Sequence, residues 1–293
     1  MKGLLAYLGL RAGVGLIGLL PGRVARALGN ASGRLWYRFD SGRRTIAQRN
    51  MERVMGNGAA PVDASQRVMK SYGRYFAEAL WFRRRRVEAM VDNTIVEGLD
   101  MILAARDEGH GMIYGLPHMG NWEAAAPVAV REGVPVVAVA EDLPNKRITK
   151  WFTDMRAGFG IEIVLATGRI EVMRRLEAAL ADNKAVALLS DRDLKGRGVE
   201  VEFFGEMTTL PPGPATLAIR TGAPLFPVAS YFDGNGHRLV IRPAIPVPDL
   251  EKRADKVRAM TQTLATEMEK LIREAPDQWH MVVPNWPSDR EQS

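Results

Sequence analysis

The sequence contains no cysteine among its 293 residues, which excludes disulfide bonds, thiolate zinc ligands and a cysteine nucleophile. Only four histidines are present, so a histidine-rich metal site is not expected. The sequence also has no glycine-rich phosphate loop and no Gly-x-Ser-x-Gly nucleophile elbow. These absences argue against nucleotide hydrolysis, serine esterase chemistry and a metal centre.

A hydrophobic run long enough to cross a membrane is also lacking. Residues 3–20 are the most apolar stretch, but Arg11 interrupts it and Pro21 ends it. A spanning helix needs about 20 apolar residues, and a charge near its centre costs several kcal/mol. No convincing small-residue cleavage site of a signal peptide precedes Pro21. We expect a helix that lies in the membrane interface, and the alternative is a helix packed on the protein's own core.

Positive charge is concentrated at the N-terminus. Residues 1–53 contain ten Lys and Arg against two acidic residues, which gives +8 within a total net charge of +6. A basic, apolar segment on a nearly neutral body predicts an anionic membrane surface as a partner. Nucleic acid is not expected, because no recognised nucleic-acid motif is evident and apolar residues alternate with the arginines.

The order of patterns along the chain predicts an α/β fold. Residues 1–90 are helical in character, with helices over 34–55 and 63–84, and residues 91–293 read as one α/β unit. The run Arg83–Arg86 is either a solvated helix end or a cluster that attracts phosphates. Strand-like runs follow at residues 111–114, 134–139, 161–165, 185–189, 225–229 and 238–241, and helical runs at residues 99–106, 122–131, 146–159, 169–181, 213–221 and 251–272. This alternation predicts a mostly parallel central sheet flanked by helices, with a helical N-terminal extension.

Two segments between the predicted elements are less regular. Residues 199–204 alternate apolar and polar side chains, which predicts an edge or antiparallel strand. Residues 203–212 are interpreted as a loop that leads into the helix at 213–221. The N-terminus of that helix suits an anion, although a purely structural turn is the simpler interpretation.

His118 is the histidine whose neighbours in the sequence suggest a role in catalysis. It follows a predicted strand, precedes a predicted helix, and is separated by four residues from Glu123. Ligands usually bind at this edge of an open α/β sheet, and a neutral imidazole there can take a proton from a hydroxyl. On a regular helix His118 and Glu123 would point about 140° apart, so they meet only if His118 precedes the helix. The simpler alternative is a solvated histidine beside a glutamate favoured by the helix dipole.

A second source of carboxylates could orient the imidazole. The predicted strand 185–189 ends at Ser190-Asp191-Arg192-Asp193, and parallel strands bring their carboxyl ends to the same edge. Asp191 or Asp193 is therefore a candidate partner of His118, and a turn or helix-cap aspartate is the alternative. His110 and His237 lie beside turns and are predicted to be surface residues.

Basic residues on the predicted helix 146–159 could bind a diphosphate, although helices expose such charges routinely. They are Lys146, Arg147, Lys150 and Arg156. Arg156 lies near apolar Phe152 and Phe159, which favours a specific partner for it.

Several ordered blocks of the chain resemble the bacterial lipid A lauroyl/myristoyl acyltransferase family, within the glycerolipid acyltransferase superfamily. The blocks are Pro117-His118-Met119-Gly120-Asn121-Trp122-Glu123, Leu188-Leu189-Ser190-Asp191-Arg192-Asp193, Phe203-Phe204-Gly205, Gly213-Pro214-Ala215, Thr221-Gly222-Ala223-Pro224, Asp277-Gln278-Trp279-His280 and Trp286. Within that family the chain is most similar to the branch that acylates phosphatidylinositol mannosides.

The resemblance implies transfer of a fatty acyl group, typically palmitoyl, from acyl-CoA to a mannose hydroxyl of a phosphatidylinositol mannoside. It implies that His118 is the general base, Glu123 the motif carboxylate and Asp191 an acidic partner of the imidazole. Arg156 falls on the family's basic position near the active groove. Asn121 and Arg192, inside the matching blocks, are taken as substrate-binding residues.

No metal and no cofactor are expected, because acyl-CoA is itself a substrate. Lipid A enzymes often carry a clearer N-terminal membrane span, and the interruption by Arg11 predicts instead a peripheral protein on the cytoplasmic face of the cell membrane. The alternatives are a lysophospholipid or lipid A-type acyltransferase, a thioesterase that uses the same base on water, and a non-catalytic lipid-binding protein. Acyl chain length, the acylated mannose hydroxyl and the choice between CoA and acyl carrier protein stay open.

Overall fold

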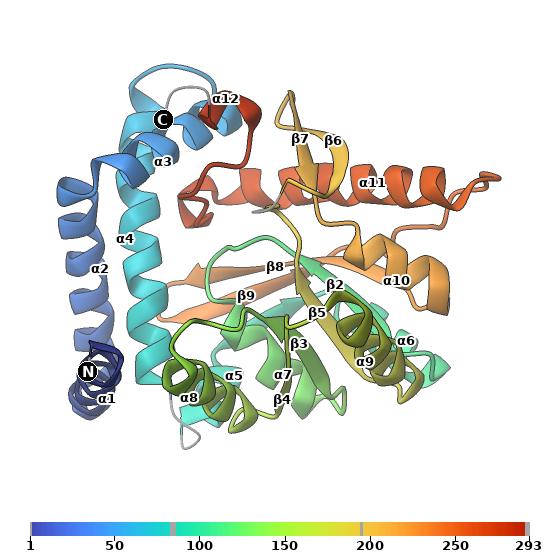
Figure 1. The fold of residues 1–293 in the computed structure, drawn as a ribbon. Helices are drawn as coiled ribbons and strands as arrows, with labels where there is room; N and C mark the ends of the chain where they lie inside the picture. The colour runs from blue at the N-terminus through green and yellow to red at the C-terminus, as the bar shows by residue number, and fades with distance from the viewer. Residues whose placement is uncertain (1, 83–85, 194–195, 291–293) are drawn as a thin grey trace.

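The computed structural model describes residues 2–82, 86–193 and 196–290 (Figure 1). Most of the predicted arginine run, residues 83–85, lies outside the described residues. In the described part of the chain, five α-helices precede the first strand: α1 (Lys2–Leu19), α2 (Gly22–Phe39), α3 (Ser41–Met55), α4 (Ala59–Trp81) and the short α5 (Val87–Asp92).

A seven-stranded sheet forms the centre of the molecule, in the order β1-β9-β8-β2-β5-β3-β4. Neighbouring strands pair in parallel except β8 and β9, which are antiparallel. The predicted mostly parallel α/β fold is therefore confirmed. The strands are β1 (Thr94–Glu97), β2 (Met112–Leu116), β3 (Val136–Ala140), β4 (Ile161–Leu165), β5 (Ala185–Leu189), β8 (Leu225–Asp233) and β9 (Gly236–Ile241).

Helices cover both faces of the sheet because alternate residues of the strands point to opposite sides. On one face, Val137 and Val186 pack with α9, α10 and α11, and on the other Tyr114 and Val136 pack with α5, α6, α7 and α8. Figure 1 shows α10 and α11 on one side of the sheet and α5, α7 and α8 on the opposite side. The helices are α5 (Val87–Asp92), α6 (Leu99–Glu108), α7 (Ala125–Arg131), α8 (Lys146–Ala157), α9 (Arg169–Ala181), α10 (Gly213–Thr221) and α11 (Arg253–Glu274).

Two sequence predictions differ from the structure. The helix predicted over 34–55 is two helices, because Asp40 leaves helical geometry and its side chain accepts a hydrogen bond from the Arg43 backbone N–H at 3.0 Å, which starts α3. Residues 206–210, interpreted as part of a loop, form the strand β7 (Glu206–Leu210). This strand pairs antiparallel with β6 (Val199–Phe203) outside the main sheet, so the predicted antiparallel strand is confirmed.

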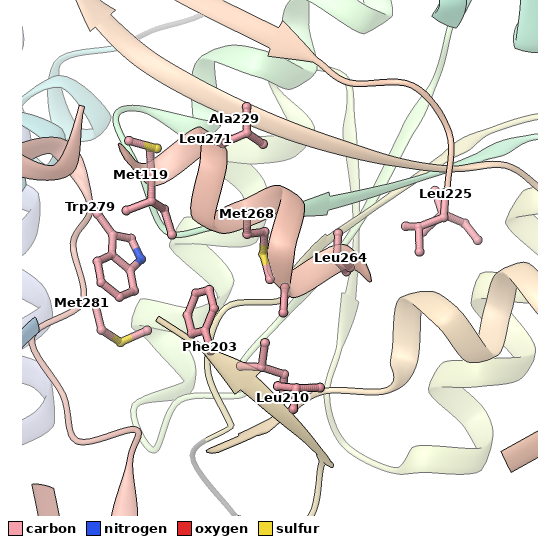
Figure 2. Packing of buried hydrophobic residues seen from close by; sticks show 14 of the residues in the cluster. Met119, Phe203, Leu210, Leu225, Ala229, Leu264, Met268, Leu271, Trp279 and Met281 are labelled. Carbon is pink, nitrogen blue, oxygen red and sulfur yellow. The ribbon is translucent and has the colours of Figure 1, made fainter. Parts of the chain in front are cut away.

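The C-terminal segment crosses back over the sheet edge. It contains two short helical turns, η3 (Pro276–Gln278) and α12 (Pro287–Arg290). Trp279 and Met281 from this segment join the buried cluster that also holds Met119 and residues of α11 (Figure 2). The chain after α11 is therefore part of the core.

Glycines allow α2 and α4 to lie unusually close together. A Cβ atom at Gly33 would be 2.1 Å from the Met69 carbonyl oxygen, and one at Gly73 would be 2.2 Å from the Gly29 carbonyl oxygen. Backbone therefore packs directly on backbone at this crossing.

Many large apolar side chains of α1 and α2 are exposed. The exposed fractions reach 65% for Leu5, 67% for Leu16 and 80% for Leu19, and Leu28 and Leu35 of α2 are also exposed. None of the helices in the described part of the chain is both long enough and apolar enough to span a bilayer.

Candidate active site

Two strand ends bring the central residues of the site together. β2 ends at Leu116 and β5 at Leu189, and these two residues are paired in the parallel register. His118 and Asp191 each lie two residues beyond, on the same edge of the sheet. The chain then turns at Gly120, where φ is +54° and a Cβ would be 2.1 Å from the Ser230 carbonyl oxygen. Only glycine fits this turn without displacing β8.

His118 is held by the buried carboxylate of Asp191. The distance from His118 Nδ1 to Asp191 Oδ1 is 2.6 Å, and the His118 backbone N–H donates to Oδ2 at 2.9 Å. Burial alone would raise the pKa of the Asp191 carboxyl, but the His118 charge and the hydrogen bonds to it lower that pKa to about 2. Asp191 therefore stays ionised and accepts the Nδ1 proton, which leaves Nε2 as the basic nitrogen. Among the described residues Nε2 has no hydrogen-bond partner.

The C-terminal segment runs beside the histidine loop. Trp279 pairs with Met119 as an isolated bridge, and its indole N–H donates to Asp191 Oδ2 at 2.8 Å. The Gly120 N–H donates to the Gln278 carbonyl at 3.0 Å, and the His280 N–H donates to the His118 carbonyl at 2.7 Å. The Gly120 amide is therefore already occupied by a hydrogen bond within the protein.

Asp193, the other candidate acid, is engaged elsewhere. Its Oδ2 accepts hydrogen bonds from the Gly198 backbone N–H and from the Thr209 hydroxyl, 3.0 Å away. The prediction that a carboxylate of the 191–193 turn reaches His118 is confirmed, and that carboxylate belongs to Asp191.

Glu123 points away from the imidazole and forms a buried ion pair with Arg156. The Arg156 Nε lies 3.0 Å from Glu123 Oε2, and the Tyr75 hydroxyl is 3.4 Å from Oε1. Burial would lower the pKa of Arg156, but the Glu123 charge reverses the shift and raises it. The pair joins α8 to the short helical turn η2 (Trp122–Ala124), which directly precedes α7. Lys146 and Lys150, on the same helix as Arg156, are exposed and paired with aspartates.

Asn121 belongs to a buried polar cluster behind the loop. Its Nδ2 donates to Glu78 Oε2 at 3.0 Å, and His237 Nε2 lies 2.9 Å from the same oxygen. Burial would raise the pKa of Glu78, but the hydrogen bond and charge of His237, the charge of Arg74 and the hydrogen bond from Asn121 together lower that pKa. The prediction of a surface position for His237 is wrong, because α4 delivers the Glu78 carboxylate to it across the sheet edge. His110 is exposed as predicted.

A largely apolar cavity of about 340 Å³ is lined by His118, by residues of the sheet and by residues of helices α4, α6, α7 and α8. Glu123, Arg156 and Arg192 line it together with His118, whereas Asn121 is not among its lining residues. Apolar side chains make up the deeper walls, among them Leu99, Ile102, Ala129, Val136, Ile163 and Leu239. A catalytic-type histidine thus faces a space suited to a hydrocarbon chain.

The sequence of the chain matches known proteins over almost its whole length. Residues 2–288 match the bacterial lipid A biosynthesis acyltransferase family. The chain belongs to this acyltransferase family. It is 36% identical over 297 residues to the phosphatidylinositol mannoside acyltransferase of Mycolicibacterium smegmatis, an alignment that covers 99% of this chain and 94% of that protein. It is also 35% identical over 269 residues to the protein of the same name from Mycobacterium tuberculosis, covering 87% of this chain and 83% of that protein.

In this acyltransferase, several residues around His118 carry no clear signal in the sequence. Tyr75 comes from α4, and its ring stacks on Trp122 at 4.0 Å. His280 is buried, stacks on Tyr72 at 4.7 Å and lies 2.9 Å from the Ser71 hydroxyl through Nε2. Both positions depend on packing between distant segments, which local patterns do not report. Within the described ranges, no three His, Asp or Glu side chains gather as metal ligands.

The acyltransferase should lose stability in mild acid because of His280. Burial, with a further contribution from the His118 charge, lowers the pKa of His280 from 6.5 to about 3. Between these values the unfolded chain binds a proton that the folded protein does not, so stability falls as the pH drops from 6.5 toward 3, by about 1.4 kcal/mol per pH unit. His280→Gln should reduce the change in unfolding free energy between pH 7 and pH 5 by about 2 kcal/mol. Urea unfolding at pH 7 and pH 5 measures this change in unfolding free energy. The exposed His110→Gln serves as control, and an unchanged pH dependence in His280→Gln would contradict the assignment.

Proposed function

We propose that this acyltransferase moves a palmitoyl-type acyl chain from acyl-CoA to a mannose hydroxyl of a phosphatidylinositol mannoside, with His118 as general base. The observation that carries the proposal is the pairing of His118 Nδ1 with the buried Asp191 on the wall of a largely apolar cavity of about 340 Å³. A base with a fixed tautomer, next to a space for a hydrocarbon chain, suits the transfer of an acyl group to an alcohol.

The reaction follows from the protonation states of this pair. As the mannose oxygen attacks the thioester carbonyl, its proton passes to His118 Nε2, and the ionised Asp191 stabilises the imidazolium that forms. The new C–O bond forms, the C–S bond breaks, and the proton moves from His118 to the sulfur of the departing CoA. The base is then free for the next cycle. General-base assistance of this kind contributes about 10²- to 10⁴-fold in rate.

The acyl chain occupies the apolar cavity in this proposal. Burying each CH₂ group contributes about 0.8 kcal/mol, so a long chain binds through many small increments along the walls. Glu123 and Arg156 neutralise one another where they line this cavity, and their ion pair fixes α8 against η2. In this proposal Glu123 and Arg156 stabilise the cavity wall and do not transfer the proton.

The acceptor is inferred from the relatives. Both mycobacterial proteins are named for the acylation of phosphatidylinositol mannoside, and the similarity to the first covers 99% of this chain. A lipid A or lysophospholipid acceptor would use the same histidine and cavity, so the acceptor must be decided by assay.

We infer that α1 and α2 rest on the cytoplasmic face of the membrane. Their exposed leucines can enter the headgroup boundary while the arginines among them contact anionic lipids. Asn145, at the start of α8, donates to the Gly3 carbonyl at 2.8 Å, so α1 contacts the helix that lines the cavity. A lipid substrate would then leave the bilayer close to the site.

Vesicle flotation should detect this contact. Binding should be stronger to anionic than to neutral vesicles, and high salt should weaken it only in part, because burial of leucine is not screened. Replacing Leu5, Leu16 and Leu19 by serine should weaken binding at least about tenfold. Ile170→Ser, an equally exposed apolar residue on α9, is the control. Equal binding to both vesicle types that salt does not affect would contradict the peripheral arrangement.

The function itself is tested with purified protein, radiolabelled palmitoyl-CoA and four acceptors: a phosphatidylinositol mannoside, lysophosphatidic acid, a lipid A precursor and water. We expect ester formation on the mannoside and little on the others. Free palmitate as the only product would indicate a thioesterase, and no turnover with tight lipid binding would indicate a lipid carrier. Preference for either other lipid would overturn the assignment of the acceptor.

A further inference from the structure

Arg192 lines the cavity and has no hydrogen-bond or ion-pair partner in the part of the chain that the structure describes. It directly follows Asp191, is partly buried and lines the same cavity as His118. Within residues 2–82, 86–193 and 196–290, its guanidinium forms no hydrogen bond and no ion pair. The two neighbouring carboxylates are occupied, since Asp191 binds His118 and Trp279 while Asp193 binds Gly198 and Thr209. A partly buried cation without an acceptor is costly unless a ligand provides one.

Tyr72 supplies a second unused donor beside it. Its hydroxyl has no hydrogen-bond partner among the described residues, and its ring lines the cavity. Arg192 is close enough for its charge to act on this hydroxyl. Burial raises the pKa of Tyr72, and the charges of Arg192 and Arg43 only reduce that rise, so the O–H remains a donor.

The surroundings hold Tyr72 in place. Its ring stacks on His280 at 4.7 Å, on Phe76 at 4.7 Å and on Trp36 at 5.5 Å. Arg43 stacks over Trp36 on the outer side and is paired with Asp40. The Tyr72 hydroxyl is therefore held in position beside Arg192, and both line a largely apolar cavity, as in a preformed ligand site.

We propose that Arg192 and Tyr72 bind a phosphate group of a substrate, a role that rests on the proposed function and specifies its acceptor side. A guanidinium and a hydroxyl match phosphate oxygens, and Arg suits this task because its donors are arranged as a planar fork. The phosphodiester of a phosphoinositol mannoside fits best. Only the sugar and inositol rings separate this phosphate from the hydroxyl that must reach His118. In acyl-CoA a long pantetheine arm separates the diphosphate from the thioester.

Calorimetric titration tests the site without relying on acyl transfer. The probes are glycerophosphoinositol, which carries the phosphodiester, CoA, which carries the diphosphate, and free inositol, which carries neither. We expect Arg192→Gln to weaken binding of glycerophosphoinositol about tenfold to a hundredfold and Tyr72→Phe to weaken it several-fold. Arg192→Lys should keep part of the affinity, and Arg169→Gln, which removes an exposed charge away from the cavity, should keep all of it.

The outcomes separate the possible sources of the phosphate. A loss for glycerophosphoinositol alone supports the acceptor subsite, and a loss for CoA alone supports a phosphate site but overturns its assignment to the acceptor. Wild-type affinity for both probes in Arg192→Gln, no binding of either probe by the wild type, or an equal loss in Arg169→Gln overturns the proposal. If the probes bind as expected but no acyl transfer occurs with any acceptor, the proposed function fails while the phosphate site stands.

Discussion

His118→Ala should reduce acyl transfer by at least about a hundredfold, and by as much as 10⁴-fold, because His118 is the one histidine among the described residues that line the cavity. Glu123 is paired with Arg156, and His280 is neutral and buried with its Nε2 beside Ser71. The loss should fall on kcat, since the proposed role of the imidazole is to take the reacting proton and the cavity proposed for the acyl chain is unchanged. Steady-state kinetics with palmitoyl-CoA and the mannoside acceptor measure it.

The variant protein should fold normally. Asp191 retains hydrogen bonds from Trp279 and from the backbone N–H of residue 118, so its charge remains compensated after the ring is removed. A melting temperature close to that of the wild type verifies this, and His110→Ala, an exposed histidine outside the site, should keep full activity. Turnover by His118→Ala near the wild-type rate would eliminate the general-base role.

Asp191→Asn should reduce kcat by about 10²- to 10⁴-fold while leaving the fold intact. An amide cannot stabilise the imidazolium, and its N–H₂ group can present a donor to Nδ1, which favours the wrong tautomer.

The negative charge of Asp191 also contributes to the stability of the fold. Because the pKa of Asp191 lies near 2 in the folded protein and near 3.8 when unfolded, its contribution is present above about pH 4 and is lost as the pH falls toward 2. Asp191→Asn should therefore lack this loss of folding stability at low pH.

Trp279→Phe perturbs the Asp191 carboxylate less than Asp191→Asn does, because it removes only one hydrogen bond to it. The substitution keeps an aromatic ring in the core but removes the N–H that donates to Asp191 Oδ2, so the pKa of Asp191 should rise toward its ordinary value. We expect a loss of about tenfold in kcat with little change in KM, and an acid limb of the activity profile shifted to higher pH. Trp286→Phe removes an indole N–H bound to the Phe203 carbonyl in the same segment, and this control should not shift the pH profile. An identical effect of both variants would mean that Trp279 acts through packing alone.

The sequence was sufficient for the fold and for placing His118 beside the turn that holds Asp191 and Asp193, but it left open which of the two aspartates pairs with the imidazole. Alternating periodicities predicted the parallel sheet, and that sheet placed the ends of two strands, and hence His118 and Asp191, on one edge. The pairs formed by Glu123 with Arg156 and by Glu78 with His237 were not predictable, because each joins elements whose packing depends on the whole core. His237 illustrates the limit: the turn beside it indicates exposure, yet α4 covers it. The break between α2 and α3 is not evident from the sequence, because nothing in the local pattern shows that the Asp40 side chain caps the start of α3.

The close crossing of α2 and α4 makes these two helices a single mechanical unit. Because backbone touches backbone at Gly33 and Gly73, α2 can neither slide along α4 nor rotate against it without a clash. α2 presents exposed leucines outward, and α4 carries Tyr72 and Tyr75 on the cavity wall. The exposed leucines of α2 and the two tyrosines of the cavity wall therefore belong to one rigid pair of helices.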